Sequence, residues 1–160
     1  MSVHQRDPTF STFTSEQAKH YANSRPSYPT ELFQCVFDHH AANGGSFKKL
    51  LDVGCGPGKA TRDMLPMFEE VIGIDAGPEM IKTARELGGT TKSGKEVQYE
   101  VSRAEEIDKI AGLQEETVDM ITGATCAHWI DMSEFWPAAA KVLKPGGTVA
   151  LWARAPMHCR

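Results

Sequence analysis

The sequence predicts an α/β protein in which helices cover both faces of a mainly parallel β-sheet. Short apolar runs that end at glycine or a polar residue alternate along the chain with segments of helical pattern. The hydrophobic period changes from about two residues to about 3.6 at each step. Parallel strands need such helical crossovers. The 160 residues suit one domain, with a helical segment over 1–45, an α/β core over 46–152 and a tail over 153–160.

Two helices are expected before the first strand. Thr14 and Gln17 form a capping-box pattern, so a short helix should begin there and end near residue 21. A second helix is expected over about 28–42, where a glycine-containing turn ends it. The apolar run at 50–53 then ends at glycine, which predicts a buried first strand followed by another helix.

The middle of the chain repeats this order of strand and helix. The apolar run at 71–74 predicts the second strand, and a helix over about 78–87 should bury an apolar face that includes Leu87. A polar loop then leads to an alternating strand at 97–101 and a short helix near residue 105.

Two further strands complete the predicted sheet. The fourth lies at 118–122, and the helix after it has an apolar face that runs from Phe135 to Leu143. Residues 144–147, with the sequence Lys-Pro-Gly-Gly, should end that helix before a fifth strand at 148–152. Sheets of this kind bind ligands at the carboxyl ends of their strands.

Composition narrows the class of partner. With 17 basic and 21 acidic residues the net charge is -4, which gives no attraction to nucleic acid or to anionic membranes. The N-terminus lacks the apolar core of a signal peptide, and no apolar run is long enough to span a membrane, so we expect a cytoplasmic protein. The cysteines form no C-x-x-C pair, and we expect reduced thiols and no metal site. They are Cys35, Cys55, Cys126 and Cys159.

The turn after the first strand is the most informative motif. It places glycine at alternate positions, Gly54, Gly56 and Gly58, between a strand and a helix. Without Cβ atoms such a turn can adopt positive φ angles and bring its backbone against a ligand, while the helix that follows favours a negative group. A tight turn with no ligand is the alternative interpretation.

Asp75 ends the second predicted strand, where its carboxylate can accept hydrogen bonds from ribose hydroxyls. This position indicates a nucleoside ligand, although Asp75 could instead cap the helix that follows. The dinucleotide-binding pattern G-x-G-x-x-G would need a third glycine where Lys59 stands, which disfavours a nicotinamide or flavin enzyme.

Four motifs in this order resemble the class I S-adenosylmethionine-dependent methyltransferases: Asp-Val-Gly-Cys-Gly-Pro-Gly at 52–58, Asp75, Ala-Glu at 104–105 and Leu-Lys-Pro-Gly-Gly at 143–147. The resemblance implies a Rossmann-like, doubly wound sheet of order 3-2-1-4-5, S-adenosylmethionine as cofactor and methyl transfer as the reaction. A narrower similarity, at 21–29 and at His128-Trp129, is to trans-aconitate methyltransferase-like enzymes that act on small molecules.

The resemblance also implies a role for each site residue. The glycines would flank the methionine portion of the cofactor, with Asp52 near its ammonium group and Asp75 on the ribose. Arg25 suits a bidentate contact with the cofactor carboxylate, and the segment after the fourth strand would border the transferring methyl group. The full implied set is Tyr21, Arg25, Asp52, Gly54, Cys55, Gly56, Gly58, Asp75, Ala76, Met80, Ala104, Glu105 and Thr122.

Several of these residues keep a second interpretation. Tyr21 could be simple packing and Arg25 a surface charge. His128 could act as a general base or merely line the acceptor pocket, and Trp129 could form that pocket or belong to the core. The acceptor is expected to be a small molecule with a carboxylate, hydroxyl or amine group.

The chain departs from the family pattern after the fifth strand, because the family's sheet has seven strands and only five are predicted here. We therefore expect a C-terminal truncation that leaves strand five as an open edge. A homodimer or another chain could cover that edge. The alternative function is a non-catalytic homologue that binds S-adenosylmethionine or a partner protein.

Overall fold

The computed structural model describes residues 12–155. Its centre is a five-stranded sheet of order β3-β2-β1-β4-β5 in which all neighbouring strands are parallel, as predicted. The strands are β1 (Lys49–Val53), β2 (Glu70–Asp75), β3 (Gln98–Val101), β4 (Val118–Ala124) and β5 (Leu143–Trp152). The α-helices are α1 (Ser15–Ser24), α2 (Thr30–Ala42), α3 (Lys59–Met64), α4 (Pro78–Leu87) and α5 (Met132–Val142). Three short 3-10 helices are η1 (Leu65–Met67), η2 (Ala104–Lys109) and η3 (Ala127–Trp129).

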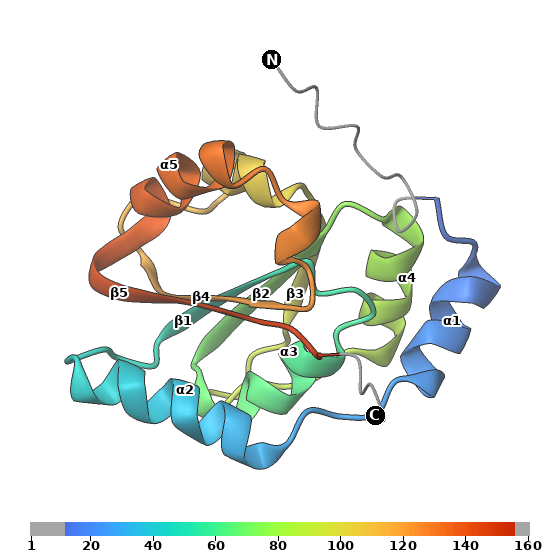
Figure 1. Ribbon diagram of the computed structural model, residues 1–160, viewed down its shortest axis with the longest axis horizontal. Helices are drawn as coiled ribbons and strands as arrows, with labels where there is room; N and C mark the ends of the chain where they lie inside the picture. Colours follow the sequence, from blue (N-terminus) through green and yellow to red (C-terminus); the bar gives the residue numbers. More distant parts are fainter. Residues whose placement is uncertain (1–11, 156–160) are drawn as a thin grey trace.

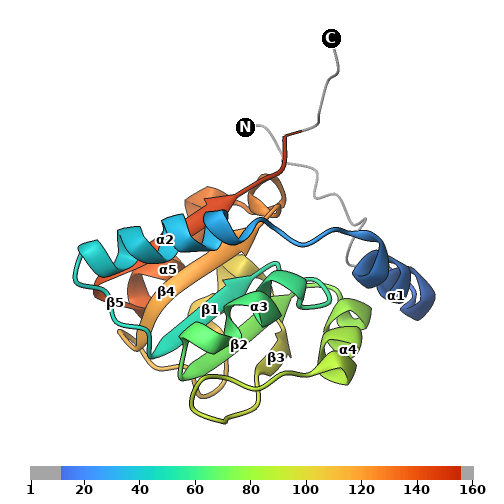
Figure 2. The same cartoon turned by 90° about the horizontal axis from the view of Figure 1, so that it is seen from below.

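Helices cover both faces of the sheet, which confirms the predicted fold class. In Figure 1, α5 lies on one side of the sheet and α2 and α3 lie on the other, and Figure 2 shows α4 on the same side as α3. Successive side chains of β1 point to opposite faces of the sheet: Leu51 belongs to the apolar cluster that contains Phe135 of α5, whereas Leu50 belongs to the cluster that contains Phe37 of α2. The doubly wound arrangement follows from strands that are apolar on both faces.

The N-terminal helix begins where the sequence predicts. The backbone N–H of Gln17 donates to Thr14 Oγ1 at 3.3 Å, and the backbone N–H of Thr14 donates to Gln17 Oε1 at 2.9 Å, which completes the capping box. The helix is longer than expected. It lies beside α4 (Figure 1), where Lys19 and Glu86 form an ion pair at 3.6 Å.

Two local predictions were wrong. Leu87 lies in the last turn of α4 and is 52% exposed, so it is not part of the buried face. The expected break at residues 144–147 is part of β5, which begins at Leu143. The pairing of β5 with β4 is irregular over this segment: Val118 pairs with Leu143, and the next pair is Met120 with Thr148, so β5 has extra residues between the two pairs.

A buried polar network lies at the amino ends of the strands. His40 Nδ1 lies 2.7 Å from Thr148 Oγ1, and His40 Nε2 lies 2.9 Å from the carbonyl oxygen of Ser46. Asp119 accepts hydrogen bonds from Ser46 Oγ at 2.6 Å and from Lys144 Nζ at 2.9 Å. These contacts tie α2, β4 and β5 together at the end of the sheet opposite to the predicted site.

Candidate cofactor site

The turn after β1, called here the glycine loop (residues 54–58), has the backbone that the sequence predicts. Its glycines at positions 54, 56 and 58 have φ angles of 59°, 54° and 82°, in the region that residues with a Cβ atom avoid. A Cβ atom on Gly58 would lie only 2.4 Å from the hydroxyl oxygen of Tyr99. On Gly56 it would lie 3.8 Å from the ring of Tyr21. The loop therefore presents bare backbone toward α1.

Asp75 connects this loop to α4. Its Oδ2 accepts a hydrogen bond from the N–H of Gly56 at 2.9 Å, and its Oδ1 accepts one from the N–H of Gly77, the N-cap residue of α4, at 2.8 Å. Burial raises the pKa of Asp75, and the two backbone hydrogen bonds oppose that shift. Each carboxylate oxygen has a second lone pair, so the half-buried side chain can still accept hydrogen bonds from a ligand.

Asp52 lies in the middle of the sheet and is 1% exposed. Its Oδ2 accepts a hydrogen bond from Thr61 Oγ1 at 2.6 Å, and its Oδ1 accepts one from Thr122 Oγ1 at 2.7 Å. Burial raises the pKa of Asp52 to about 6, although both hydroxyl groups act to lower it. Thr122 itself is fully buried, so it contacts Asp52 and has no surface to offer a ligand.

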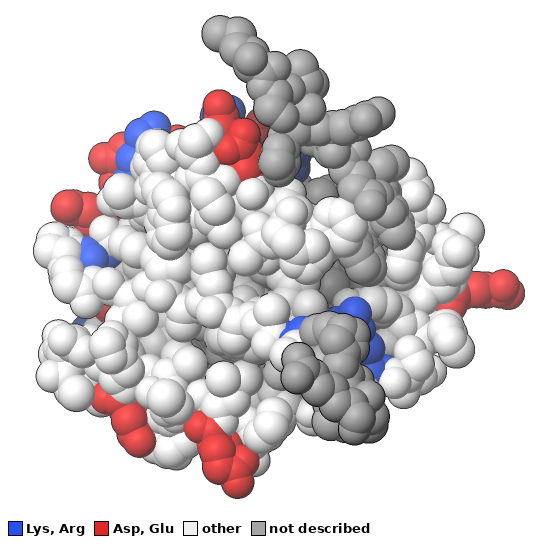
Figure 3. All heavy atoms as spheres, viewed as in Figure 1, with Lys and Arg blue, Asp and Glu red and all other residues white. Residues whose placement is uncertain are grey.

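A pocket lies between the glycine loop and the segment that joins α1 to α2, called here the linker (residues 25–29). Three basic side chains line it. Lys59 Nζ donates to the carbonyl oxygen of Arg25, and Arg154 Nη2 donates to those of Pro26 and Ser27 at 2.6 and 2.8 Å. Figure 3 shows basic atoms gathered beside the end of β5.

The implied site residues divide into two groups. The pocket brings together six of them, namely Tyr21, Arg25, Asp52, Gly54, Cys55 and Gly56. Ala104 and Glu105, implied for the adenine site, follow β3 and lie outside the pocket lining, as does Ala76, which follows β2. Met80 belongs to the buried side of α4 and is absent from the pocket lining.

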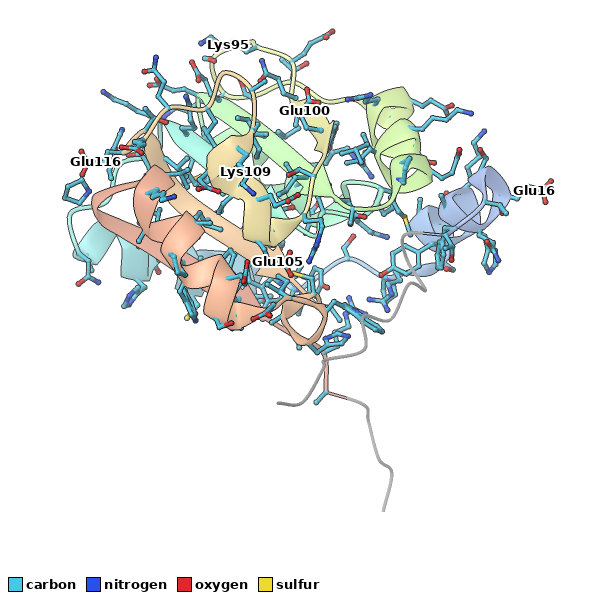
Figure 4. All side chains as sticks on the ribbon, turned by 90° about the horizontal axis from the view of Figure 1, so that it is seen from above. Glu16, Lys95, Glu100, Glu105, Lys109 and Glu116 are labelled. Atoms are coloured by element: carbon cyan, nitrogen blue, oxygen red, sulfur yellow. The ribbon has the colours of Figure 1, made fainter. Side chains whose placement is uncertain are left out.

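Glu105 is held in a fixed position. Its Oε1 accepts a hydrogen bond from the N–H of Asp131 at 2.9 Å and pairs with Arg103 at 3.2 Å. Figure 4 shows Glu105 between η2 and the start of α5. The carboxylate thereby links the end of β3 to the helix that follows β4.

The segment after β4 is constrained at Thr125. This residue has a φ angle of 55°, which is rare for a β-branched side chain. Its N–H donates to the carbonyl oxygen of Trp152 at 2.6 Å, and its Oγ1 lies 2.7 Å from the hydroxyl oxygen of Tyr28. Strained backbone of this kind clusters at ligand sites.

His128 and Trp129 lie farther along the same segment, and neither lines the pocket. Their ring centroids are 4.6 Å apart. Trp129 is 41% exposed, so it does not belong to the core.

Eight residues that line the pocket were not in the implied set. They are Ala22, Pro26, Tyr28, Pro57, Lys59, Ala60, Ala124 and Arg154. Tyr28 and Lys59 stood inside or beside recognised motifs. Arg154 lies in the part of the chain that was predicted to be a tail, and its contacts with the linker join distant parts of the sequence. No local pattern signals such a contact.

Two absences hold for residues 12–155. No three His, Cys, Asp or Glu side chains in this part of the chain come together as a metal site would require. No helix within it has both the length and the apolar character needed to cross a membrane.

The strand order, the glycine loop and the acidic residue that ends β2 define a protein of the class I S-adenosylmethionine-dependent methyltransferase type. Residues 51–151 match the family model described as "Methyltransferase domain", and the chain belongs to this family.

The chain is 34% identical over 136 residues to CRG1 of Saccharomyces cerevisiae, named as a probable S-adenosylmethionine-dependent methyltransferase. That match covers 85% of this chain and 45% of CRG1. The methyltransferase cfoB of Aspergillus candidus is 30% identical, over 91% of this chain and 45% of its own length. The chain thus spans about half the length of the curated relatives it matches.

A solved structure, that of Haemonchus contortus phosphoethanolamine N-methyltransferase 2 in complex with S-adenosyl-L-methionine, superimposes with a TM-score of 0.63. The superposition covers 94% of this chain and 35% of that one, at 23% sequence identity. At this identity the likeness concerns the fold alone.

Proposed function

We propose that this chain is the cofactor-binding part of a methyltransferase that transfers a methyl group from S-adenosylmethionine to a small-molecule acceptor. The observation that carries the proposal is the bare glycine loop, whose Gly56 N–H is fixed by Asp75 at the carboxyl end of the sheet. Family membership supports it.

The residues present fit S-adenosylmethionine. A side chain on Gly56 would enter the space in front of Tyr21, so the glycine keeps that space open. The basic side chains around the pocket suit the carboxylate of the methionine portion. Asp52 suits its ammonium group, and Asp75 suits the ribose hydroxyls. The lining of the pocket thus combines three basic side chains with the carboxylate of Asp52, the two kinds of charge that a zwitterionic ligand requires.

The cofactor supplies a methyl group that its sulfonium already activates. The task of the chain is to orient it: the glycine loop flanks the methionine portion, Asp75 positions the nucleoside end, and Arg25 positions the carboxylate end. Ala104 and Glu105 would border the adenine. Thr125 and the segment after it would face the acceptor, and His128 would take a proton from a hydroxyl or amine acceptor. A carboxylate acceptor needs no base.

A small-molecule acceptor is supported by charge and by geometry. The net charge of -4 gives no attraction to the phosphate backbone of a nucleic acid. The linker lines one side of the pocket and is held there by Arg154, and a pocket lined in this way suits a small ligand better than a macromolecule. The free thiols Cys35, Cys55 and Cys126 support a cytoplasmic location.

Calorimetric titration tests the proposal. The chain is titrated with S-adenosylmethionine, S-adenosylhomocysteine and, as a control, NAD. We expect saturable binding of both adenosyl ligands, none of NAD, and at least about tenfold weaker binding by Asp75→Ala, which loses a charged acceptor. A folded chain that binds neither adenosyl ligand would contradict the proposal.

A non-catalytic, partner-binding role is the second candidate, favoured by the edge of the sheet. Within the described residues β5 pairs only with β4, so its other edge has free backbone groups. A second copy or another chain could pair there. Light scattering tests whether a second copy pairs there. A monodisperse monomer up to about 100 µM, well above the dissociation constant of a stable dimer, would argue against self-association.

A further inference from the structure

We propose that Thr61 and Thr122 are positioning residues that hold the carboxylate of Asp52 ionised and aimed into the pocket, where it pairs with a cationic ammonium group of the ligand. The identity of that ligand rests on the proposed function. The arrangement involves two hydroxyls, those of Thr61 and Thr122, that lie outside the glycine motif.

The geometry is complete on the protein side. Asp52 and Thr122 are directly opposite each other in the parallel pairing of β1 and β4, and Thr61 reaches the same carboxylate from α3. Each hydroxyl donates to a different oxygen of Asp52, at 2.6 and 2.7 Å. Both threonines are 0% exposed. They have no surface for a ligand and can act on one only through Asp52.

Four acidic groups interact electrostatically with Asp52. They are Asp75 of β2, Cys55 of the glycine loop, Cys126 after β4 and Tyr99 of β3. Three basic side chains line the same pocket, and each has another partner. Lys59 donates to the carbonyl oxygen of Arg25, and the guanidinium group of Arg25 lies 4.7 Å from the ring centroid of Tyr21. Arg154 donates to the carbonyl oxygens of Pro26 and Ser27. A buried carboxylate is costly without a cation. Two neutral hydroxyls reduce that cost without cancelling the charge, which leaves Asp52 matched to a positively charged ligand.

This arrangement makes ligand affinity depend on pH. Protonation of Asp52 removes the charge that the ammonium group needs, so affinity should fall by about tenfold for each pH unit below the midpoint. Loss of either hydroxyl removes a donor that favours the ionised carboxylate, so the midpoint should move to higher pH.

The test is calorimetric titration of S-adenosylhomocysteine into the wild type, Thr61→Val and Thr122→Val from about pH 5 to about pH 7.5, on either side of the expected midpoint. Valine keeps the volume of threonine and removes the hydroxyl. We expect the affinity deficit of both variants to widen toward low pH and to narrow toward neutral pH. Thr148→Val, which loses a hydroxyl contact to His40 at the other end of the sheet, is the matched control and should follow the wild-type profile.

A second ligand isolates the ammonium group. 5′-Methylthioadenosine has the adenosine and sulfur but lacks the amino acid portion, so its affinity should not depend on pH in this range or on either hydroxyl. If the valine variants fail to fold, Asp52→Asn and Thr122→Ser replace them. The first should bind S-adenosylhomocysteine weakly at every pH, and the second should keep the wild-type midpoint.

The outcomes separate two failures. Wild type that binds neither adenosyl ligand would sink the proposed function itself. Wild type that binds, with valine variants weakened equally at every pH or not at all, would overturn the positioning role of the threonines. Retention of the wild-type pH profile by Asp52→Asn would overturn it as well.

Discussion

The guanidinium group of Arg154 lies 4.8 Å from the ring centroid of Tyr28 and hydrogen-bonds the two carbonyls before it. Arg154, which follows β5 in the chain, thereby fixes the linker, and the linker forms one wall of the pocket.

Arg154→Ala should loosen this wall. The variant loses two hydrogen bonds and a cation–π contact at an exposed position, so we expect S-adenosylhomocysteine to bind about three- to tenfold more weakly, with stability changed by less than about 1 kcal/mol. Titration calorimetry and urea unfolding measure the two quantities. Lys109, which is labelled in Figure 4, is a surface cation that pairs with Glu106 at 3.6 Å, and Lys109→Ala should change neither quantity. Unchanged affinity in Arg154→Ala would mean that the other contacts suffice to hold the linker.

Gly58→Ala should destabilise the fold more than Gly94→Ala. The two glycines have nearly equal φ angles, 82° and 83°, so both variants suffer similar backbone strain of about 1 kcal/mol. A Cβ atom meets nothing within 4 Å at Gly94 but collides with Tyr99 at Gly58. We expect a further loss of about 2 kcal/mol there, measured by urea unfolding. Equal losses would show that Tyr99 can move aside freely.

Tyr99→Phe should not destabilise the protein. Among the described residues, the hydroxyl group of this 3% exposed side chain makes no hydrogen bond of standard geometry, although the guanidinium group of Arg62 acts on it to lower its pKa against the larger effect of burial. Removal of an unsatisfied buried hydroxyl is neutral or stabilises by up to about 1 kcal/mol. A loss of more than about 1 kcal/mol in urea unfolding would reveal a partner for that hydroxyl in solution.

Asp52→Asn should stabilise the unliganded protein at neutral pH. The pKa of Asp52 is about 6 in the folded state, above its ordinary value of 3.8, so the folded state binds the proton more tightly than the unfolded state. The stability that this proton provides is lost as pH rises from about 4 to about 6. At pH 7 the asparagine variant should be more stable by on the order of 2 kcal/mol, and the difference should shrink toward pH 4.

Asp119→Asn should show the opposite dependence on pH. Burial alone would raise the pKa of Asp119, but hydrogen bonds from Ser46, Lys144 and the backbone N–H of Lys49 outweigh burial and lower it. The stability it contributes is present above the ordinary pKa and is lost in acid. The variant should be less stable than wild type at pH 7, with a gap that closes below about pH 4. A gap that stays constant with pH would contradict the role of the charge.

Local sequence patterns were enough to predict most of the helices, strands and turns. The capping box at Thr14, the three glycines at positive φ and the parallel order of the strands each depend on residues close in sequence or on a general rule of topology. The position of Asp75 at a strand end followed for the same reason.

The remainder depends on contacts between distant residues. The pairing of Asp52 with Thr122 is set by strand register, and the hold of Arg154 on the linker joins opposite ends of the chain. Thr122 lay in the predicted site, yet its register turns it inward to Asp52. The early start of β5 arises because β4 supplies a partner for Leu143, which no pattern within residues 143–147 reveals.

The bare glycine loop also divides the molecule for redesign. Its shape comes from main-chain geometry on β1 and β2, whereas Thr125, His128 and Trp129 follow a different strand. The residues after β4 could be exchanged while the glycine loop is left unchanged. The hydrogen bond between Tyr28 and Thr125 is a tether between the two regions, and a transplanted surface would need to keep it.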